Sequence, residues 1–314
     1  NADAMLNIYD DRDYLIRSIQ KASLLSGTNS IEWDGNDFQG NSAPAEAYHY
    51  TLTANSHKDN VTYDVTDLTG NKLYTIKNIK WSKSEGAFIY NLANISRVLI
   101  RVGLKEHGPL LVTISNWEAK TYGQQVEKWN GKDATGVLEL SNHPNLFIFA
   151  QAYTLSDNTI LVATSSSKYK YIPEKYLKGK RESNYKHIQR IAAPQQQKPE
   201  TRGDFVANLS IPGMEIDDKL GAYIVNGTVP ITLDLSADKR ELMLSRRMES
   251  VYYVDGQFTY ESEISYLPMT WKLDTSVLNE GEHFVSVNLR GYEGNFGLAT
   301  LKLYVQPDNA ESKK

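Results

Sequence analysis

Two short groups of carboxylate and amide side chains beside a tryptophan are the residues best suited to bind a cation. WDGNDFQG occupies residues 33–40, and WNGKDATG occupies residues 129–136, 96 positions later. Aspartate and asparagine oxygens are ligands that Ca²⁺ prefers, so an acidic site used twice is one interpretation. The acidic residues do not have the spacing of a calcium loop, and Lys132 stands where the first group has Asn36. A lysine inside the loop opposes a bound cation, so the pattern favours a structural corner.

In a structural corner these side chains shape a turn instead of binding a ligand. The tryptophan would end a strand and fill the core, Asp34 or Asn130 would accept hydrogen bonds within the turn, and Gly35 or Gly131 would adopt a positive φ. The residues that we predict to form the two corners are Trp33, Asp34, Gly35, Asp37, Gly40, Trp129, Asn130, Gly131, Asp133 and Gly136.

No arrangement of side chains predicts an enzyme. The 314 residues include no cysteine, which excludes a thiol nucleophile, a disulfide framework and a cysteine zinc site. The six histidines never have the spacing of a local metal pair, and we expect His283 in a turn and the others at the surface. Ser165 with Lys168 and Ser236 with Lys239 match a serine acyl-enzyme motif, but that chemistry needs an α/β domain. We therefore predict no catalytic residue, no cofactor and no metal.

The basic segment from residue 165 to residue 202 is the strongest candidate for binding a partner. Ten Lys or Arg residues against three Glu give it a net charge of +7, within a chain whose net charge is −4. Tyrosines between the basic residues would add contact area against an acidic protein or a polyanion, whereas the alternative is a solvated linker. The predicted partner-binding residues are Lys168, Tyr169, Lys170, Tyr171, Lys175, Tyr176, Lys178, Lys180, Arg181, Tyr185, Lys186 and Arg190.

Short runs of alternating apolar and polar residues, separated by turn residues, predict β-strands along the rest of the chain. Helical periodicity is weak, and its best candidates are residues 11–21 and 173–190. We predict an all-β fold of three Ig-like, fibronectin-III-like sandwiches with little helix. The predicted divisions are a first domain at 1–80, a second at 81–164, the basic connector at 165–203, a third domain at 204–307 and a tail at 308–314.

The surroundings of the two corners resemble a known repeat. Both have a strand, a turn, a strand, a glycine-containing loop, a strand ending in Trp, a tight acidic turn and another strand; residues 6–54 match it closely and residues 97–152 loosely. The pattern resembles the FlgD-type Ig-like (fibronectin-III-like) repeat of the bacterial flagellar hook-capping family, with Asp13, Glu46 and Asn130 as departures. The third domain resembles other bacterial Ig-like domains through Trp271 and the turn at His283. These resemblances imply a fold and say little about function.

These features predict a non-enzymatic, exported bacterial protein that acts as a structural or adaptor subunit at the cell surface, in the periplasm or outside the cell. We expect its partner to be another protein, and neither nucleic acid nor a membrane span is indicated. The alternative is a carbohydrate-binding accessory protein that uses exposed aromatic residues of the third domain; the candidates are Tyr252, Tyr253, Tyr260 and Tyr266. Asp255, Glu261 and Glu263 could imitate a glycosidase pair, but an exposed polar strand face explains them better.

Overall fold

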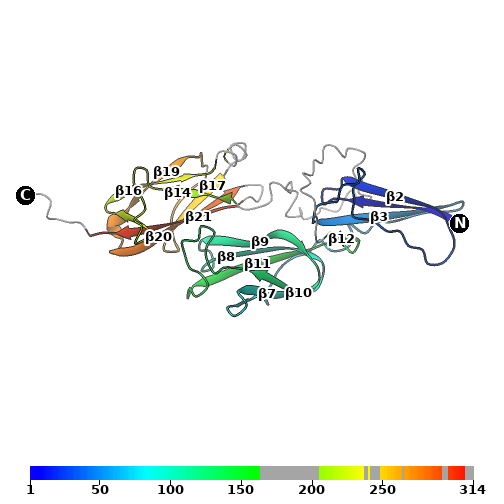
Figure 1. Ribbon diagram of the computed structural model, residues 1–314, viewed down its shortest axis with the longest axis horizontal. Helices are drawn as coiled ribbons and strands as arrows, with labels where there is room; N and C mark the ends of the chain where they lie inside the picture. Colours follow the sequence, from blue (N-terminus) through cyan, green and yellow to red (C-terminus); the bar gives the residue numbers. More distant parts are fainter. Residues whose placement is uncertain (163–204, 237–239, 241–247, 264, 292–295, 308–314) are drawn as a thin grey trace, which may run out of the picture.

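The computed structural model describes residues 1–162, 205–236, 240, 248–263, 265–291 and 296–307. These residues form five β-sheets arranged in three units, with the first unit at one end of the molecule and the third at the other (Figure 1). The prediction of an all-β, Ig-like, fibronectin-III-like fold is confirmed. Residues 163–204, which include every predicted partner-binding residue, and the second helix candidate at 173–190 lie outside the described residues.

The first unit has a single sheet, in the order β12-β3-β1-β2, with β4 also paired to β3. Its strands are β1 (Ala2–Tyr9), β2 (Leu15–Leu24), β3 (Ala47–Ser56), β4 (Asn60–Tyr63) and β12 (Thr159–Leu161). The helix candidate at residues 11–21 was wrong, because most of it belongs to β2, which pairs antiparallel with β1. Tertiary pairing overrides the weak helical periodicity there.

The middle unit is a sandwich of two sheets, ordered β5-β11-β8-β9 and β10-β7-β6. All nine residues of β8 are buried. One face of this central strand packs against the second sheet, and from the other face Arg97 contacts the first unit and Arg101 contacts the third. The strands are β5 (Leu73–Thr75), β6 (Lys80–Ser82), β7 (Ala87–Leu92), β8 (Ser96–Leu104), β9 (Leu110–Lys120), β10 (Gly123–Lys128) and β11 (Leu146–Thr154).

The third unit packs the sheet β13-β21-β20-β17-β18, with β15 also paired to β21, against the sheet β14-β16-β19. Apolar side chains from both sheets meet in two adjoining core clusters. The elements are β13 (Phe205–Val206), β14 (Asn208–Ser210), β15 (Tyr223–Val225), β16 (Thr228–Asp234), β17 (Met248–Val254), β18 (Gln257–Ser262), β19 (Met269–Asp274), the 3₁₀ helix η3 (Thr275–Val277), β20 (Gly281–Gly291) and β21 (Phe296–Val305).

The strand predicted just before Trp33 is absent, because residues 25–32 are coil. The corresponding strand before Trp129 is β10, which is held by backbone pairing to β7. The first unit has no described strand in the position of β7, so the chain before Trp33 has no partner to make it a strand.

Candidate functional site at the junctions between the units

Two chain segments cross side by side between the first and middle units. Residues 64–72 lead from β4 to β5, and residues 155–158 lead from β11 back to β12, which pairs with β3 of the first sheet. Strand β12 therefore lies within the predicted second domain, 81–164, but pairs in the sheet of the first unit, while β5, within the predicted first domain, 1–80, pairs with β11 of the middle unit. The first crossing is joined to the end of β11 by backbone hydrogen bonds from Asn71 N to Thr154 O (2.8 Å) and from Thr154 N to Lys72 O (2.9 Å). Asp157 N of the second crossing donates to Thr69 Oγ1 of the first (2.9 Å). A double crossing restrains rotation between the units more than a single linker does.

Hydrogen bonds of Asn158 connect this double crossing to the first sheet. Its side chain is fully buried, and its amide donates to Tyr50 O (2.6 Å) and to Thr66 Oγ1 (2.8 Å). The backbone of Tyr50 donates in return to Asn158 O (3.1 Å). One asparagine therefore ties the second crossing both to β3 and to the first crossing.

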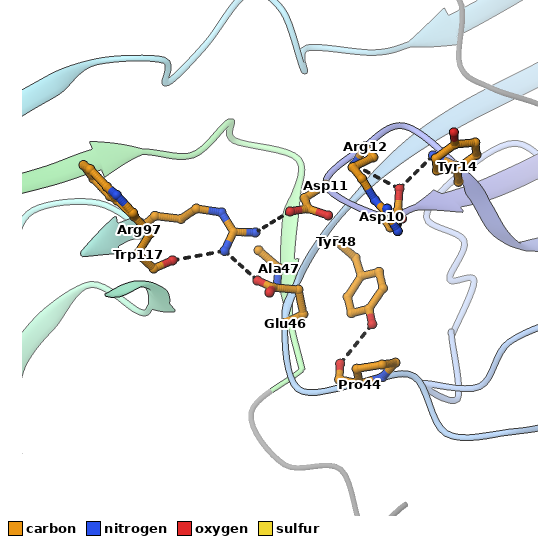
Figure 2. A network of polar contacts seen from close by, with 10 residues as sticks. All are labelled: Asp10, Asp11, Arg12, Tyr14, Pro44, Glu46, Ala47, Tyr48, Arg97 and Trp117. Carbon is orange, nitrogen blue, oxygen red and sulfur yellow. Dashed lines mark hydrogen bonds and ion pairs between the residues drawn. The ribbon is translucent and has the colours of Figure 1, made fainter. Parts of the chain in front are cut away.

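Arg97 is the central charged group of the first junction. It extends from β8 of the middle unit, and its side chain is 3% exposed. Its guanidinium lies 2.7 Å from Glu46 Oε1 and 3.4 Å from Asp11 Oδ2, both in the first unit, and donates to Trp117 O (3.2 Å). Figure 2 shows the arginine reaching from its own unit to the two carboxylates of the neighbouring unit.

The carboxylates near Arg97 offset part of the free-energy cost of burying its charge. Burial lowers the pKa of the Arg97 guanidinium, and the charge of Asp11 raises it; an arginine nevertheless stays protonated in proteins. The two carboxylates are each 13% exposed at the side chain, so they are largely withdrawn from water. Such a buried ionic group contributes specificity of geometry more than net stability, because desolvation offsets much of the attraction.

The junction between the middle and third units is closed by a reciprocal pair of hydrogen bonds. Leu110 N donates to Asn288 Oδ1 (2.9 Å), and Asn288 Nδ2 donates to Leu110 O (2.6 Å). Asn288 is fully buried although it stands on the face of β20 opposite to Val287 and Leu289, which fill the core of the third unit. That opposite face is buried against β9 of the middle unit, beside which β20 and β21 lie (Figure 1).

Aromatic contacts extend the second junction. The Arg101 guanidinium lies 4.2 Å from the ring centroid of Phe296, a distance that suits a cation–π contact. Phe284 of β20 packs against the core cluster of the middle unit that includes Leu104 and Trp129. The core of the middle unit is therefore continuous with a side chain of the third.

His283, which was expected in a turn, lies in strand β20 because its backbone pairs with Leu303 of β21, and it adds a titratable group next to this contact. Its Nδ1 lies 2.6 Å from Asp255 Oδ2, and its Nε2 lies 2.8 Å from Asn279 O. Asp255 also accepts from Phe284 N (2.9 Å). Burial lowers the pKa of His283, but hydrogen bonds to Asp255 and Asn279 and the charge of Asp255 raise it, and the net effect is a pKa above its ordinary value of 6.5.

The raised pKa predicts that the third unit loses stability as pH rises. Protonated His283 favours the folded state, so its contribution is complete below 6.5, the pKa of the unfolded state, and is lost as pH increases through the folded-state pKa. Melting temperatures from about pH 5.5 to 8.5, on either side of the histidine range, should separate wild type from His283→Gln at the acid end and bring them together at the alkaline end. His57→Gln, at an exposed histidine, should follow wild type throughout; an equal gap at every pH would contradict the prediction.

The two corners have the same hydrogen bonds. The indole of Trp33 donates to Asn36 O and that of Trp129 to Lys132 O, each at 2.8 Å. Asp34 and Asn130 each accept from the backbone N–H two residues later, and the bonds from Asn36 lower the pKa of Asp34. The buried Asp37 and Asp133 accept backbone N–H groups of their own turns. The four glycines all have positive φ: Gly35, Gly40, Gly131 and Gly136.

Three side-chain expectations were wrong, each because packing against the face of a sheet buries the residue. His49, expected at the surface, is 7% exposed, stacks on Tyr9 and lies 3.1 Å from Asp13. Tyr252 and Tyr253, candidates for binding sugar, are 0% and 3% exposed in β17. Tyr260 and Tyr266 do face solvent. Glu261 and Glu263 are also exposed, whereas Asp255 holds the turn beside His283.

The junction residues Arg97, Asn158 and Asn288 were not predicted from the sequence. A signal exists for one of them: Arg97 lies near the start of the mainly apolar strand β8, and a polar side chain in such a strand is buried with a partner or faces another surface. Asn288 stands at a polar position of a strand in which polar and apolar residues alternate, so its sequence context predicts exposure to solvent. No comparable signal marks Asn158, which lies in a turn. Among the described residues, no three His, Asp or Glu side chains converge as metal ligands, and no helix there has the length and apolarity to cross a membrane.

The fold defines an all-β protein of Ig-like, fibronectin-III-like units, with polar and aromatic contacts at the junctions between them. Residues 1–59 match the family model of the FlgD Ig-like domain. No curated protein sequence matches the chain.

Solved structures similar to the chain include the fibronectin(III)-like modules of Clostridium thermocellum CbhA, at 10% identity over 75% of this chain and 94% of that one, with a TM-score of 0.22. The endo-beta-1,4-mannanase from Thermotoga petrophila is similar at 14% identity over 34% of this chain, with a TM-score of 0.24, and the chain spans only 20% of that protein. The extracellular domain of BT3049 from B. thetaiotaomicron is similar at 10% identity over 96% of this chain and 35% of that one, with a TM-score of 0.23.

Proposed function

We propose that the protein is a non-enzymatic structural or adaptor subunit of an exported bacterial assembly, at the cell surface or in the periplasm. The observation that carries this proposal is that both junctions are closed by buried polar groups, Arg97 in one and Asn288 in the other. Units joined only by a flexible linker do not need such contacts. Fixed units hold their binding surfaces at set distances, which is what a scaffold requires.

Distances between labelled units test the proposed rigidity. The chain has no cysteine, so spin labels on cysteines introduced at Lys58 and Lys132, which are exposed in the first and middle units, report one junction without background. A single narrow distribution of distances between the two spin labels is expected from double electron–electron resonance. A broad distribution, comparable to that of two domains on a flexible linker, would remove the basis of the scaffold proposal.

The basic connector at 165–203 is the proposed contact for an acidic partner protein, and its net charge supports this. Exchange of Lys168, Lys170, Arg181 and Lys186 for Gln should abolish a salt-sensitive complex that wild type forms with its partner in the native host. Exchange of four lysines outside the connector, Lys58, Lys77, Lys80 and Lys83, is the matched control. An equal loss of the complex in both variants would show that the total charge of the chain controls binding and that the connector has no special role.

Carbohydrate binding is the second candidate function, and exposed aromatic residues of the third unit support it. Tyr260 is 37% exposed and stacks on Trp271, with 5.8 Å between ring centroids, while Tyr266 is 78% exposed. Aromatic rings with one free face suit stacking against apolar faces of a ligand. Retardation in polysaccharide gels that disappears in Tyr260→Ala and Tyr266→Ala, but not in Tyr122→Ala of the middle unit, would favour this function over the adaptor.

A further inference from the structure

The inner face of the sheet in the first unit is only partly covered. Leu6, Ile8 and Tyr48 are covered by Ile31 and Trp33 from the long coil that follows β2. Figure 1 shows this coil beside the sheet of β2 and β3, where the middle unit has a second sheet. Further along the same face, Val61 and Tyr63 of β4 are 63% and 41% exposed.

The middle unit shows what covers the same surface in a complete sandwich. Strand β7 inserts Phe88, Tyr90 and Leu92, which are 0%, 1% and 3% exposed. Trp129 packs between Phe88 and Trp81, with ring centroids 5.3 Å and 4.8 Å away. The hairpin of β6 and β7 therefore supplies the aromatic groups that close the core over this tryptophan.

The sheet of the first unit and the β5-β11-β8-β9 sheet of the middle unit have the same strand register, so their residues can be compared position by position. Leu6 of β1 pairs with Leu52 of β3, and Val102 and Ile148, each 96 residues later, pair in the same way. Beside them, Val61 lies opposite Ala54, and Ile76 donates its backbone N–H to Ala150 O. Val61 therefore occupies the position of Ile76, which is 3% exposed and packs with Tyr90 and Leu92.

In the part of the chain that the structure describes, the backbone just before Trp33 pairs with no strand, whereas the middle unit has a strand at this position. β10 pairs antiparallel with β7 from Gly123 to Lys128, and the residues 96 positions earlier, 27–32, form no strand. Within the described residues no backbone-to-backbone hydrogen bond joins them to a neighbouring segment, and the side chain of Lys21 in β2 donates to Ser30 O (2.8 Å). Exposed N–H and C=O groups beside an apolar surface are the features to which an added strand binds.

We propose that this open face, formed by residues 27–33 with Leu52, Val61 and Tyr63, binds a β-hairpin of a separate partner protein. The hairpin would pair antiparallel with residues 27–32 and place apolar or aromatic side chains at alternate positions over Trp33 and Val61, as β7 does over Trp129 and Ile76. The proposal rests on the proposed adaptor function, because it assigns a surface by which a partner is held. A second copy of the chain is a poor donor, since its own β7 already pairs on both edges, with β6 and β10.

A synthetic peptide with the sequence of Lys80–Leu92, KWSKSEGAFIYNL, is the probe. Binding of the labelled peptide to the full chain is followed by fluorescence polarisation, and saturable binding at one peptide per chain is expected. A peptide with Ser at the positions of Phe88 and Tyr90 should bind at least about tenfold more weakly, because two buried aromatic groups are lost.

A matched pair of variants on β4 locates the peptide. Val61→Asp places a charge on the open face and should weaken peptide binding at least about tenfold, whereas Thr62→Asp, on the opposite face of the same edge strand, should bind like wild type. Both residues are exposed, so neither variant should unfold the sheet, and circular dichroism checks this.

Absence of saturable peptide binding overturns the proposal, as does equal binding by wild type and Val61→Asp. Sedimentation as a dimer that Val61→Asp dissociates would show that a second copy covers the face, and would also overturn it. The distance distribution between Lys58 and Lys132 does not depend on this face, so failure here is distinguishable from failure of the proposed function.

Discussion

Replacement of Arg97 by leucine is expected to destabilise the first junction by about 3–5 kcal/mol, the usual effect of removing one partner of a buried ion pair. Leucine cannot hydrogen-bond to Trp117 O, and it leaves Glu46 and Asp11 close together without the cation between them. The units should then separate or rotate to hydrate the carboxylates, so the distance distribution across the junction should broaden. Urea denaturation followed by circular dichroism measures the loss of stability.

Arg290→Leu is the matched control, since Arg290 is exposed on β20, and it should change stability by less than about 0.5 kcal/mol. Arg97→Lys should fall between wild type and leucine, because lysine keeps the charge but loses the planar fork that reaches several acceptors at once. A distance distribution in Arg97→Leu as narrow as that of wild type would show that the double crossing alone fixes the units.

Replacement of Trp129 by alanine is expected to cost the middle unit about 3–5 kcal/mol, the range for deleting a large buried aromatic group. The indole is 9% exposed, contacts both Trp81 and Phe88, and belongs to the cluster that Phe284 joins from the third unit. Its deletion should therefore also loosen the second junction. Urea denaturation followed by the fluorescence of the remaining tryptophans measures the change.

Trp33→Ala is the natural comparison, because Trp33 makes the same turn hydrogen bond but is only half-buried, and among the described residues its aromatic contact is an edge contact with Tyr48. We expect a smaller loss of stability, about 1–2 kcal/mol, in line with less apolar surface removed from contact. Equal losses of stability at Trp33 and Trp129 would mean that the core of the first unit is already fully covered. This result would weaken the proposal that its open face binds a β-hairpin.

Much of the fold could be predicted from the sequence because the period of two along each strand is a local property. The register of β1 with β3 follows from Leu6 and Ile8 facing one core, and the corner turns follow from glycine at positive φ and an Asx side chain. The failures come from non-local effects. The strand expected just before Trp33 does not form, because residues 25–32 lack a partner strand, and Tyr252 lies in a strand whose two faces are both covered.

The sequence by itself determined the β class, the two corners with equivalent turns and the absence of cysteine chemistry, because each depends on residue type and short spacing. Only the tertiary structure decided that Arg97 meets Asp11 and Glu46, that Asn288 meets Leu110, and that β12 returns to the first sheet. These contacts join residues up to 178 positions apart. No local pattern encodes such a pairing, because it depends on how completed sheets pack against one another.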